Sequence, residues 1–494
     1  MSQEKRKELL DKAYQSIAEK KDKVENDYYR LQYHVMPPAG WLNDPNGFIQ
    51  FDGVYHLFYQ FHPWAPESGL KYWGHYTSQN LVNWEEQPIA LTPSKWYETH
   101  GCYSGSAVDD DGVLTLMYTG NVKDDGVRSS YQCLVTSADG INFKKSEGNP
   151  VIDKQPEGYT AHFRDPKVWK KDGTWYLVIG AQTVAEEGRV LLYKSANLKE
   201  WDLIGEVVGS NLNGLDNFGY MWECPDLFTL GEKEVLIVLP QGLEAQGDLY
   251  NNIYQAGYLV GELDYETGEF NHGEFIELDR GFDFYAAQTT LDQQGRRIMI
   301  AWMGMPEEDE KYAERENGWI HAMTLPRVLE LREDNKLIQK PVPELKQLRQ
   351  EKIDYKKVKI KDEELELDQI CGDVVELIAE FEIEDASEFG IKVRCAQDGS
   401  EETVIKYDTN NQKLSLNRNK SGRGESGIRR CLLESDSMVK LHLFIDTSSL
   451  ELFANEGEEV FSSRLYPSKE SQGIKFFAQD GQVTLKKVTK WNLE

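Results

Sequence analysis

Between residues 44 and 305 the hydrophobic and polar positions recur five times in the same order. Each unit has a polar or acidic lead-in, a short strand, a tight turn and a strongly apolar strand. In the first unit residues 48–51 and 55–59 flank the turn Asp52-Gly53. Asp-Gly between β-rich runs is typical of a hairpin, and the spacing of the turns leaves room for a four-stranded unit each time. The pattern therefore predicts a five-bladed β-propeller.

The third and fourth units, at residues 165–179 and 223–239, follow the first closely, whereas the second and fifth fit more loosely. The first strand of each propeller blade lines the central channel, so the lead-ins open onto one end of that channel. Three lead-ins carry a carboxylate at nearly the same offset before the turn: Asp44, Asp165 and Glu223. We expect these three side chains to converge.

The remaining segments predict an all-β protein with one short helix at the N-terminus. Residues 1–30 are charged and have apolar positions at helical spacing, and Pro341 and Pro343 interrupt regular structure after the propeller. The C-terminal region alternates polar and apolar residues in the manner of an antiparallel β-sandwich, whose favoured role is support. The predicted divisions are a helical segment at 1–30, a propeller at 31–338, a linker at 339–352 and a sandwich at 353–494.

Charge and composition narrow the set of partners. The 494-residue chain has a formal net charge of -29 and no basic block, which argues against a nucleic-acid partner. No apolar run is long enough to span a bilayer, and no segment resembles a signal peptide. The six cysteines are scattered, so we expect reduced thiols and a cytoplasmic protein without a membrane partner. The sequence leaves open whether the chain forms a homo-oligomer.

Two carboxyl groups facing one bond are the minimum that glycoside hydrolysis requires. The neighbouring residues suit sugar binding, because indole faces pack on apolar sugar surfaces and polar side chains bond hydroxyls. Packing in the blade core is the alternative for each tryptophan. The candidate contacts are Trp41, Asn43, Gln60, Trp73, Ser104, Arg164 and Trp222.

Three sequence motifs, taken in order, resemble the signatures of a known family. They are WLNDPNG at residues 41–47, FRDP at 163–166 and WECP at 222–225. Together they resemble glycoside hydrolase family 32, the invertase and fructan-hydrolase group. Secondary matches at 59–60, 73–75, 103–106, 283–286 and 325–327 extend the resemblance over nearly the whole chain. The resemblance implies a five-bladed propeller joined to a C-terminal β-sandwich.

The resemblance also implies roles for individual residues. Asp44 would be the nucleophile on the anomeric carbon of a β-fructofuranosyl unit, and Glu223 would be the acid and later the base. Asp165 would hold fructose hydroxyls, with Arg164 beside it. The family retains configuration through a covalent fructosyl-enzyme. Tyr103, a further substrate-binding candidate, stands where this family often has Phe, and Ala287 stands where Pro is common.

The expected reaction is hydrolysis of sucrose or sucrose 6-phosphate, with a small sugar as the only partner. A phosphate would need cations, and Lys71, Lys123 and Arg128 are candidates, although each by itself also fits a solvated surface charge. Within the enzyme class an exo-fructanase or fructo-oligosaccharide hydrolase is the alternative. A non-catalytic sugar-binding propeller or lectin is the alternative of another class, disfavoured because a binder needs no acid and nucleophile together.

We expect neither a metal nor another cofactor. The run of aspartates at 109–111 superficially suggests a calcium loop, but EF-hand spacing would require an oxygen ligand at Ala107. The nine histidines have no metal-ligand spacing, and no glycine-rich phosphate loop is present.

Overall fold

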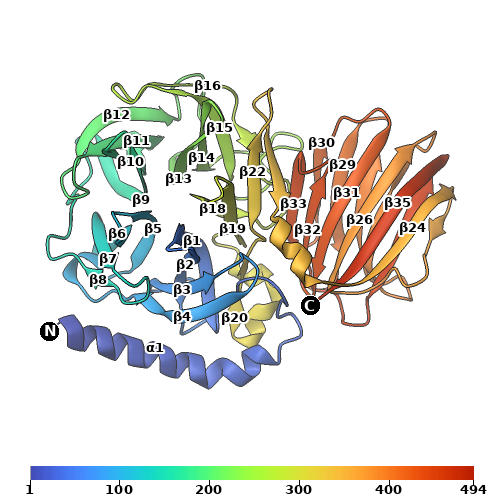
Figure 1. Ribbon diagram of the computed structural model, residues 1–494, viewed down its shortest axis with the longest axis horizontal. Helices are drawn as coiled ribbons and strands as arrows, with labels where there is room; N and C mark the ends of the chain where they lie inside the picture. Colours follow the sequence, from blue (N-terminus) through green and yellow to red (C-terminus); the bar gives the residue numbers. More distant parts are fainter. Residues whose placement is uncertain (1) are drawn as a thin grey trace.

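The structure is a ring of five β-blades with a two-sheet sandwich packed against one side (Figure 1). A computed structural model describes residues 2–494. The predicted all-β class, the five blades, the C-terminal sandwich and the N-terminal helix are all confirmed.

Each blade is an antiparallel sheet whose first strand lines the channel. Blade 1 contains β1 (Gly40–Phe51), β2 (Val54–His62), β3 (Tyr72–Ser78) and β4 (Trp84–Leu91). Blade 2 contains β5 (Cys102–Asp109), β6 (Leu114–Asp124), β7 (Val127–Ser137) and β8 (Lys144–Lys145). Blade 3 contains β9 (Tyr159–Lys171), β10 (Thr174–Thr183), β11 (Gly188–Ser195) and β12 (Asp202–Gly209). Blade 4 contains β13 (Met221–Leu230), β14 (Lys233–Gln241), β15 (Gly257–Leu263), β16 (Phe270–His272) and β17 (Ile276–Glu277).

Blade 5 also closes the ring. It contains β18 (Tyr285–Leu291), β19 (Arg297–Met303), β21 (Ala322–Met323), β22 (Arg327–Leu331) and β23 (Leu337–Pro341). The loop after β19 carries the strand β20 (Trp319–Ile320), which pairs in parallel with the start of β1. Gly40 faces Trp319 in that ladder, so the last blade is hydrogen-bonded to the first. Three single-turn 3₁₀ helices lie in loops at the ends of the blades: η1 (Trp96–Glu98), η2 (Asp309–Lys311) and η3 (Ala313–Asn317).

The N-terminal helix α1 (Ser2–Glu25) packs on the outside of the propeller near blade 1 (Figure 1). Ala13 and Val24 are buried from its inner face, and the Ser16 hydroxyl donates to the carbonyl of Pro63 at 3.0 Å. Only one narrow face of the helix meets the blade, which agrees with its small number of apolar positions.

The connection between the domains falls within the predicted linker at 339–352, and the predicted domain bounds stay predictions. The last propeller strand reaches Pro341, and the first sandwich strand, β24 (Arg349–Lys361), begins before residue 353. Between them lies only the 3₁₀ helix η4 (Pro343–Leu348), whose Leu345 and Leu348 are buried. One sandwich sheet contains β24, β26 (Val375–Ile383), β31 (Met438–Asp446), β32 (Ser449–Ala454), β33 (Glu459–Arg464) and β35 (Gln482–Leu493). The other contains β25 (Glu364–Leu365), β27 (Glu388–Cys395), β28 (Glu402–Asp408), β29 (Lys413–Lys420), β30 (Ile428–Leu432) and β34 (Gly473–Gln479).

Buried ion pairs hold the sandwich to the propeller. Arg327 of β22 is fully buried and binds Asp279 at 3.1 Å and Glu451 of β32 at 2.7 Å. Removing one partner of such a cluster would leave an uncompensated buried charge, which is strongly destabilising. The pairing therefore fixes how the two domains face one another.

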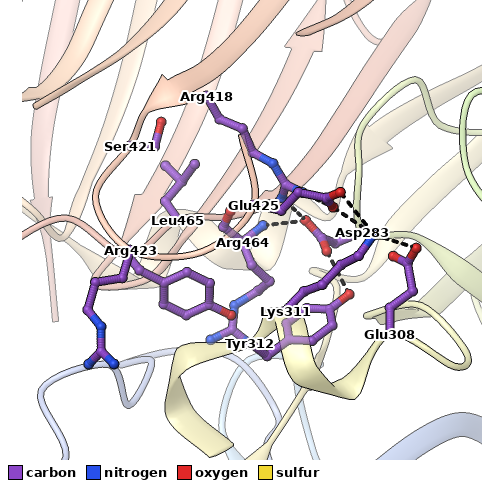
Figure 2. A pocket seen from close by; sticks show the side chains of 11 residues that line it. Asp283, Glu308, Lys311, Tyr312, Arg418, Ser421, Arg423, Glu425, Arg464 and Leu465 are labelled. Carbon is purple, nitrogen blue, oxygen red and sulfur yellow. Dashed lines mark hydrogen bonds and ion pairs between the residues drawn. The ribbon is translucent and has the colours of Figure 1, made fainter. Parts of the chain in front are cut away.

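A second joint surrounds Asp283, just before blade 5 (Figure 2). Its carboxylate accepts hydrogen bonds from Tyr312 at 2.8 Å, from Arg418 at 2.9 Å and from the backbone of Arg464 at 2.8 Å. The cavity between these side chains has a volume of about 10 Å³, which is the space of one water molecule. This joint has a structural role and no room for a sugar.

Within residues 2–494 no helix is long and apolar enough to cross a membrane. The same residues contain no cluster of three or more His, Cys, Asp or Glu side chains that could hold a metal ion. All six cysteines are free thiols. The cytoplasmic location and the oligomeric state stay predictions.

Candidate active site

The inner strands of all five blades are bulged at the same level, near the end where each strand begins. A bulge places an extra residue in one strand, bends it and re-aims a side chain. The shifts in register fall between these pairs: Leu42 and Pro45, Cys102 and Gly105, Arg164 and Lys167, Glu223 and Asp226, and Tyr285 and Gln288.

Three of the five bulges contain a proline. Pro45, Pro166 and Pro225 have no backbone N–H to give to the neighbouring strand, so the ladder is interrupted at these points. Asp165 and Cys224 adopt the left-handed region, with φ of 67° and 44°. Such a conformation costs about 1–3 kcal/mol for a residue with a side chain, and the surrounding sheets must hold it in place. The two strained residues lie at the bulges where the carboxylates of three different blades come together.

Asp44 lies at the end of the channel within a set of hydrogen-bond donors. Its Oδ1 accepts from Asn43 Nδ2 at 2.9 Å, its Oδ2 accepts from the Ser104 hydroxyl at 2.5 Å, and the thiol of Cys224 is 3.7 Å from Oδ2. Burial raises the pKa of Asp44 to about 6; the bond from Ser104 opposes this shift and the charge of Glu223 adds to it. Asp44 is therefore ionised at neutral pH and held in one orientation, which suits a nucleophile.

Asn43, Gln60 and Ser104 form a continuous chain behind Asp44. Asn43 Nδ2 also donates to Gln60 Oε1 at 3.1 Å, and the Gln60 amide donates to Ser104 Oγ. The other Asn43 atom, Oδ1, is buried and has no partner within residues 2–494. A buried acceptor without a partner is costly, so this oxygen is suited to a donor hydroxyl of a bound sugar.

Glu223 has a different environment from Asp44. Its Oε1 accepts from Arg164 Nε at 3.0 Å and Nη2 at 2.7 Å, and its Oε2 accepts from Gln241 at 2.7 Å and from Tyr285 at 2.9 Å. Burial raises the pKa of Tyr285 well above its usual value, and the charge of Glu223 adds to this, so Tyr285 remains a hydroxyl. Arg and Tyr together fix the direction in which this carboxyl group points.

Asp165 is the most enclosed of the three acids, with 6% of its side chain exposed against 18% for Glu223. Its backbone N–H donates to Thr119 Oγ1 at 3.1 Å, and its Oδ2 accepts from the backbone of Cys224 at 3.2 Å. Burial raises the pKa of Asp165, and the charge of Arg164, 3.9 Å away, opposes the shift. The Oδ1 atom has no hydrogen-bond partner in the described chain and can accept from a substrate hydroxyl.

The structure separates the predicted tryptophans. Trp41 lies at the site, where its Nε1 donates to Asp309 at 3.0 Å and the Lys71 ammonium is 3.8 Å from its ring centroid. Trp73 and Trp222 are 0% exposed, within the cores between blades. The packing alternative describes the position of Trp73 in this structure, and its contact with the substrate stays a prediction. Its Nε1 donates to the carbonyl of Tyr103 at 3.1 Å.

Two site residues, Gln241 and Tyr285, were not among the predicted contacts. Gln241 is the last residue of β14, the second strand of blade 4. Gln60 and Gln182 lie near the ends of the corresponding strands of blades 1 and 3. This recurring amide was a usable signal. Tyr285 follows Asp283 and Phe284 in a matched motif, but the sequence does not show that its hydroxyl reaches Glu223.

Comparisons with known proteins identify the family of this chain. Residues 34–341 match the N-terminal domain of glycosyl hydrolases family 32, and residues 344–492 match the C-terminal domain of that family. The chain is 48% identical over 464 residues to a sucrose-6-phosphate hydrolase of Bacillus subtilis, covering 93% of this chain and 94% of the relative. A Zymomonas mobilis protein of the same name is 42% identical over 479 residues, covering 94% and 92%.

Solved structures show the same fold. The sucrose-6-phosphate hydrolase of Lactobacillus gasseri superposes with a TM-score of 0.88 at 31% identity, covering 97% of this chain and 96% of the other. A Bombyx mori β-fructofuranosidase mutant in complex with sucrose superposes with a TM-score of 0.84 at 37% identity, covering 98% and 97%. With both domains matched over nearly their whole length, this chain belongs to glycoside hydrolase family 32 and is a glycosidase.

Proposed function

We propose that this chain cleaves the terminal β-D-fructofuranosyl residue from sucrose 6-phosphate and sucrose through a covalent fructosyl-enzyme. The observation that carries the proposal is the contrast between two carboxyl groups at one end of the channel. Asp44 is held by short bonds from Ser104 and Asn43, whereas Glu223 is flanked on one oxygen by groups that can change partners. Two carboxyl groups in different environments are the arrangement that gives one nucleophile and one acid.

In the first step Asp44 Oδ2 attacks the anomeric carbon while Glu223 gives its proton to the departing glycosidic oxygen. The bond from carbon to that oxygen breaks and an ester to Asp44 forms, so charge and atoms balance. In the second step Glu223 takes a proton from water, which attacks the same carbon and releases fructose and the carboxylate. Asp165 and Asn43 supply open acceptors for hydroxyls of the fructosyl ring, and the partly positive ring that develops in the transition state lies next to the Asp165 carboxylate.

The test of the proposal is the ranking of substrates. We expect the purified protein to release fructose from both sucrose and sucrose 6-phosphate, with kcat/KM for the phosphorylated sugar at least about tenfold higher, which is the effect of one charge-assisted hydrogen bond. A higher kcat/KM for kestose or inulin would instead favour the exo-fructanase alternative. Binding of sucrose without release of fructose would favour the lectin.

A second prediction concerns pH. Activity requires ionised Asp44, so kcat/KM is retained above a pH of about 6 and is lost as the pH falls through the pKa of this group. The Ser104 hydroxyl stabilises the ionised form, so we expect Ser104→Ala to move this acid limb upward by about one pH unit or more. The measurement is kcat/KM for sucrose as a function of pH.

Ser137→Ala is a matched control for this experiment. The Ser137 hydroxyl also donates to a carboxylate, Asp139, at 2.9 Å, in the same blade but away from the site. The acid limb of the kcat/KM profile of Ser137→Ala should lie at the same pH as that of the parent. An acid limb that is unmoved in Ser104→Ala would show that another group sets it.

A further inference from the structure

The hairpin formed by β6 and β7 lies on the same side of the propeller as the three carboxylates. The strand β5 starts at the site, so β6, which runs antiparallel to it, ends there. Two bonds fix the hairpin to the strand that carries Asp165: Thr119 Oγ1 accepts from the Asp165 backbone at 3.1 Å, and the Ser130 hydroxyl donates to the carbonyl of Ala161 at 2.7 Å. The position of the hairpin tip is therefore set relative to the acids.

The tip presents two cations toward the mouth of the site. Lys123 and Arg128 face one another in the β6–β7 ladder, so their side chains share one face. Thr119 lies on this same face because it is an even number of residues away along β6. At about 3.4 Å per residue the two cations lie roughly 14 Å along the strand from the Thr119 contact with Asp165, before their long side chains reach back.

Arg128 does reach back toward the strand that carries Ser104. Its guanidinium carbon is 5.9 Å from the ring centroid of Tyr103, at the start of β5 next to Ser104. Arg128 is half-buried, yet within residues 2–494 it has no ion pair and no side-chain hydrogen bond. The neighbouring Asp124 and Asp125 of the tip do not pair with it. By contrast, Arg164 deeper in the site is bonded to Glu223.

Other cations lie near Arg128, although the net charge of the chain is -29. Burial lowers the pKa of His162 to about 4; Arg164, Arg128 and Lys123 add to this shift, and the charge of Glu223 opposes it. This effect means that the three cations are close enough to act on one imidazole. A half-buried guanidinium without an ion pair, close to other cations and beside the proposed acid, is suited to an anionic part of the substrate.

Lys71, the remaining phosphate candidate, has other partners. Its ammonium lies over the ring of Trp41 and donates to Ser68 at 2.7 Å, and it is 93% buried next to Asp44. It therefore belongs to the nucleophile's side of the site. The charges of Arg164 and Glu223 act on Arg128, which places it on the side of Glu223, the proposed proton donor to the leaving sugar.

We propose that Arg128, with Lys123 beside it, binds the 6-phosphate of the departing glucosyl group and thereby sets the preference for sucrose 6-phosphate over sucrose. The inference rests on the proposed function, since it assigns part of the same site. Arg128 would form a bidentate contact with the phosphate oxygens, and Lys123, which is more exposed, would add a point charge.

The test compares substrate preference in Arg128→Met, Lys123→Met, Arg128→Lys and a control, Lys144→Met. Lys144 is an exposed lysine of blade 2, with 81% of its side chain exposed. The readout is the ratio of kcat/KM for sucrose 6-phosphate to kcat/KM for sucrose. We expect Arg128→Met to lower this ratio about 10- to 100-fold, Lys123→Met to lower it less, and Arg128→Lys to retain part of it. Lys144→Met should leave the ratio at the parent value.

A second readout does not depend on turnover of the phosphorylated substrate. Glucose 6-phosphate should inhibit the parent more strongly than glucose does, and Arg128→Met should remove that difference. If the parent prefers sucrose 6-phosphate and Arg128→Met keeps the preference, the assignment of Arg128 is overturned and the proposed function stands. If the parent has no preference, both the phosphate specificity and this inference are overturned, and if it releases no fructose, the proposed function itself fails.

Discussion

Replacing Asp44 by Asn is expected to lower kcat for sucrose by about 10⁴-fold or more, because the covalent step then has no nucleophile. Asn has the same shape as Asp, and both of its polar atoms have partners at this position. The Ser104 hydroxyl, which now donates to Oδ2, can rotate and accept instead, so the variant should fold normally. The loss should appear in kcat and in kcat/KM alike, since the missing bond forms only during the reaction.

The measurement is release of fructose from sucrose, together with the midpoint of thermal unfolding. Asp109→Asn is the matched control: Asp109 is exposed in the hairpin turn of blade 2, where its carboxylate accepts from the backbone of Gly112 at 2.7 Å. An amide oxygen can keep that bond, so its activity should equal that of the parent. Substantial activity in Asp44→Asn, with an unchanged unfolding midpoint, would exclude Asp44 as the nucleophile.

The repeat in the sequence was sufficient to predict which acids meet. Asp44, Asp165 and Glu223 stand at one offset before their turns, and a propeller places equivalent positions of different blades around one axis. Pro45, Pro166 and Pro225 also mark the level of the bulges, because a residue without an N–H interrupts the ladder. These features are local, so the sequence shows them directly.

Other parts of the site depend on distances between blades, which no local pattern contains. Trp41 and Trp73 look alike in sequence, but Trp73 fills the space between blades 1 and 2, whereas Trp41 contacts Asp309 and Lys71. Likewise the contact of Tyr285 with Glu223 joins the inner strands of adjacent blades. Which partners an aromatic residue contacts is a property of the assembled ring.

The hydrogen-bond partners of Glu223 indicate which of its two carboxyl oxygens carries the catalytic proton. Arg164 can only donate, so Oε1, which accepts two bonds from it, has no neighbour that would tolerate a proton. The Tyr285 hydroxyl and the Gln241 amide can each turn and accept, so Oε2 is the atom that can be protonated. In Glu223→Gln the amide oxygen can stay with Arg164 while the NH₂ group faces these two residues, so the variant should preserve the geometry.

We therefore expect Glu223→Gln to lower kcat/KM for sucrose about 10²- to 10⁴-fold, the usual contribution of a general acid. An aryl β-fructofuranoside whose phenol leaves without a proton should lose far less in kcat/KM, because its first step needs no acid. Its turnover should still be slow, since no base activates water, and the fructosyl ester on Asp44 should accumulate and be visible by mass spectrometry. Added azide, which needs no base, should speed the second step.

Glu262→Gln makes the same chemical change on β15 of the same blade, where Glu262 pairs with Lys233 on the surface at 2.6 Å, and it should behave as the parent does. The decisive comparison is between the two substrates within Glu223→Gln. An equal loss on both would mean that Glu223 only orients Arg164 or the substrate and that the proton comes from elsewhere. A loss of kcat/KM confined to sucrose, the substrate with the poor leaving group, would identify Glu223 as the proton donor. A purely structural defect would not distinguish substrates by the basicity of the departing oxygen.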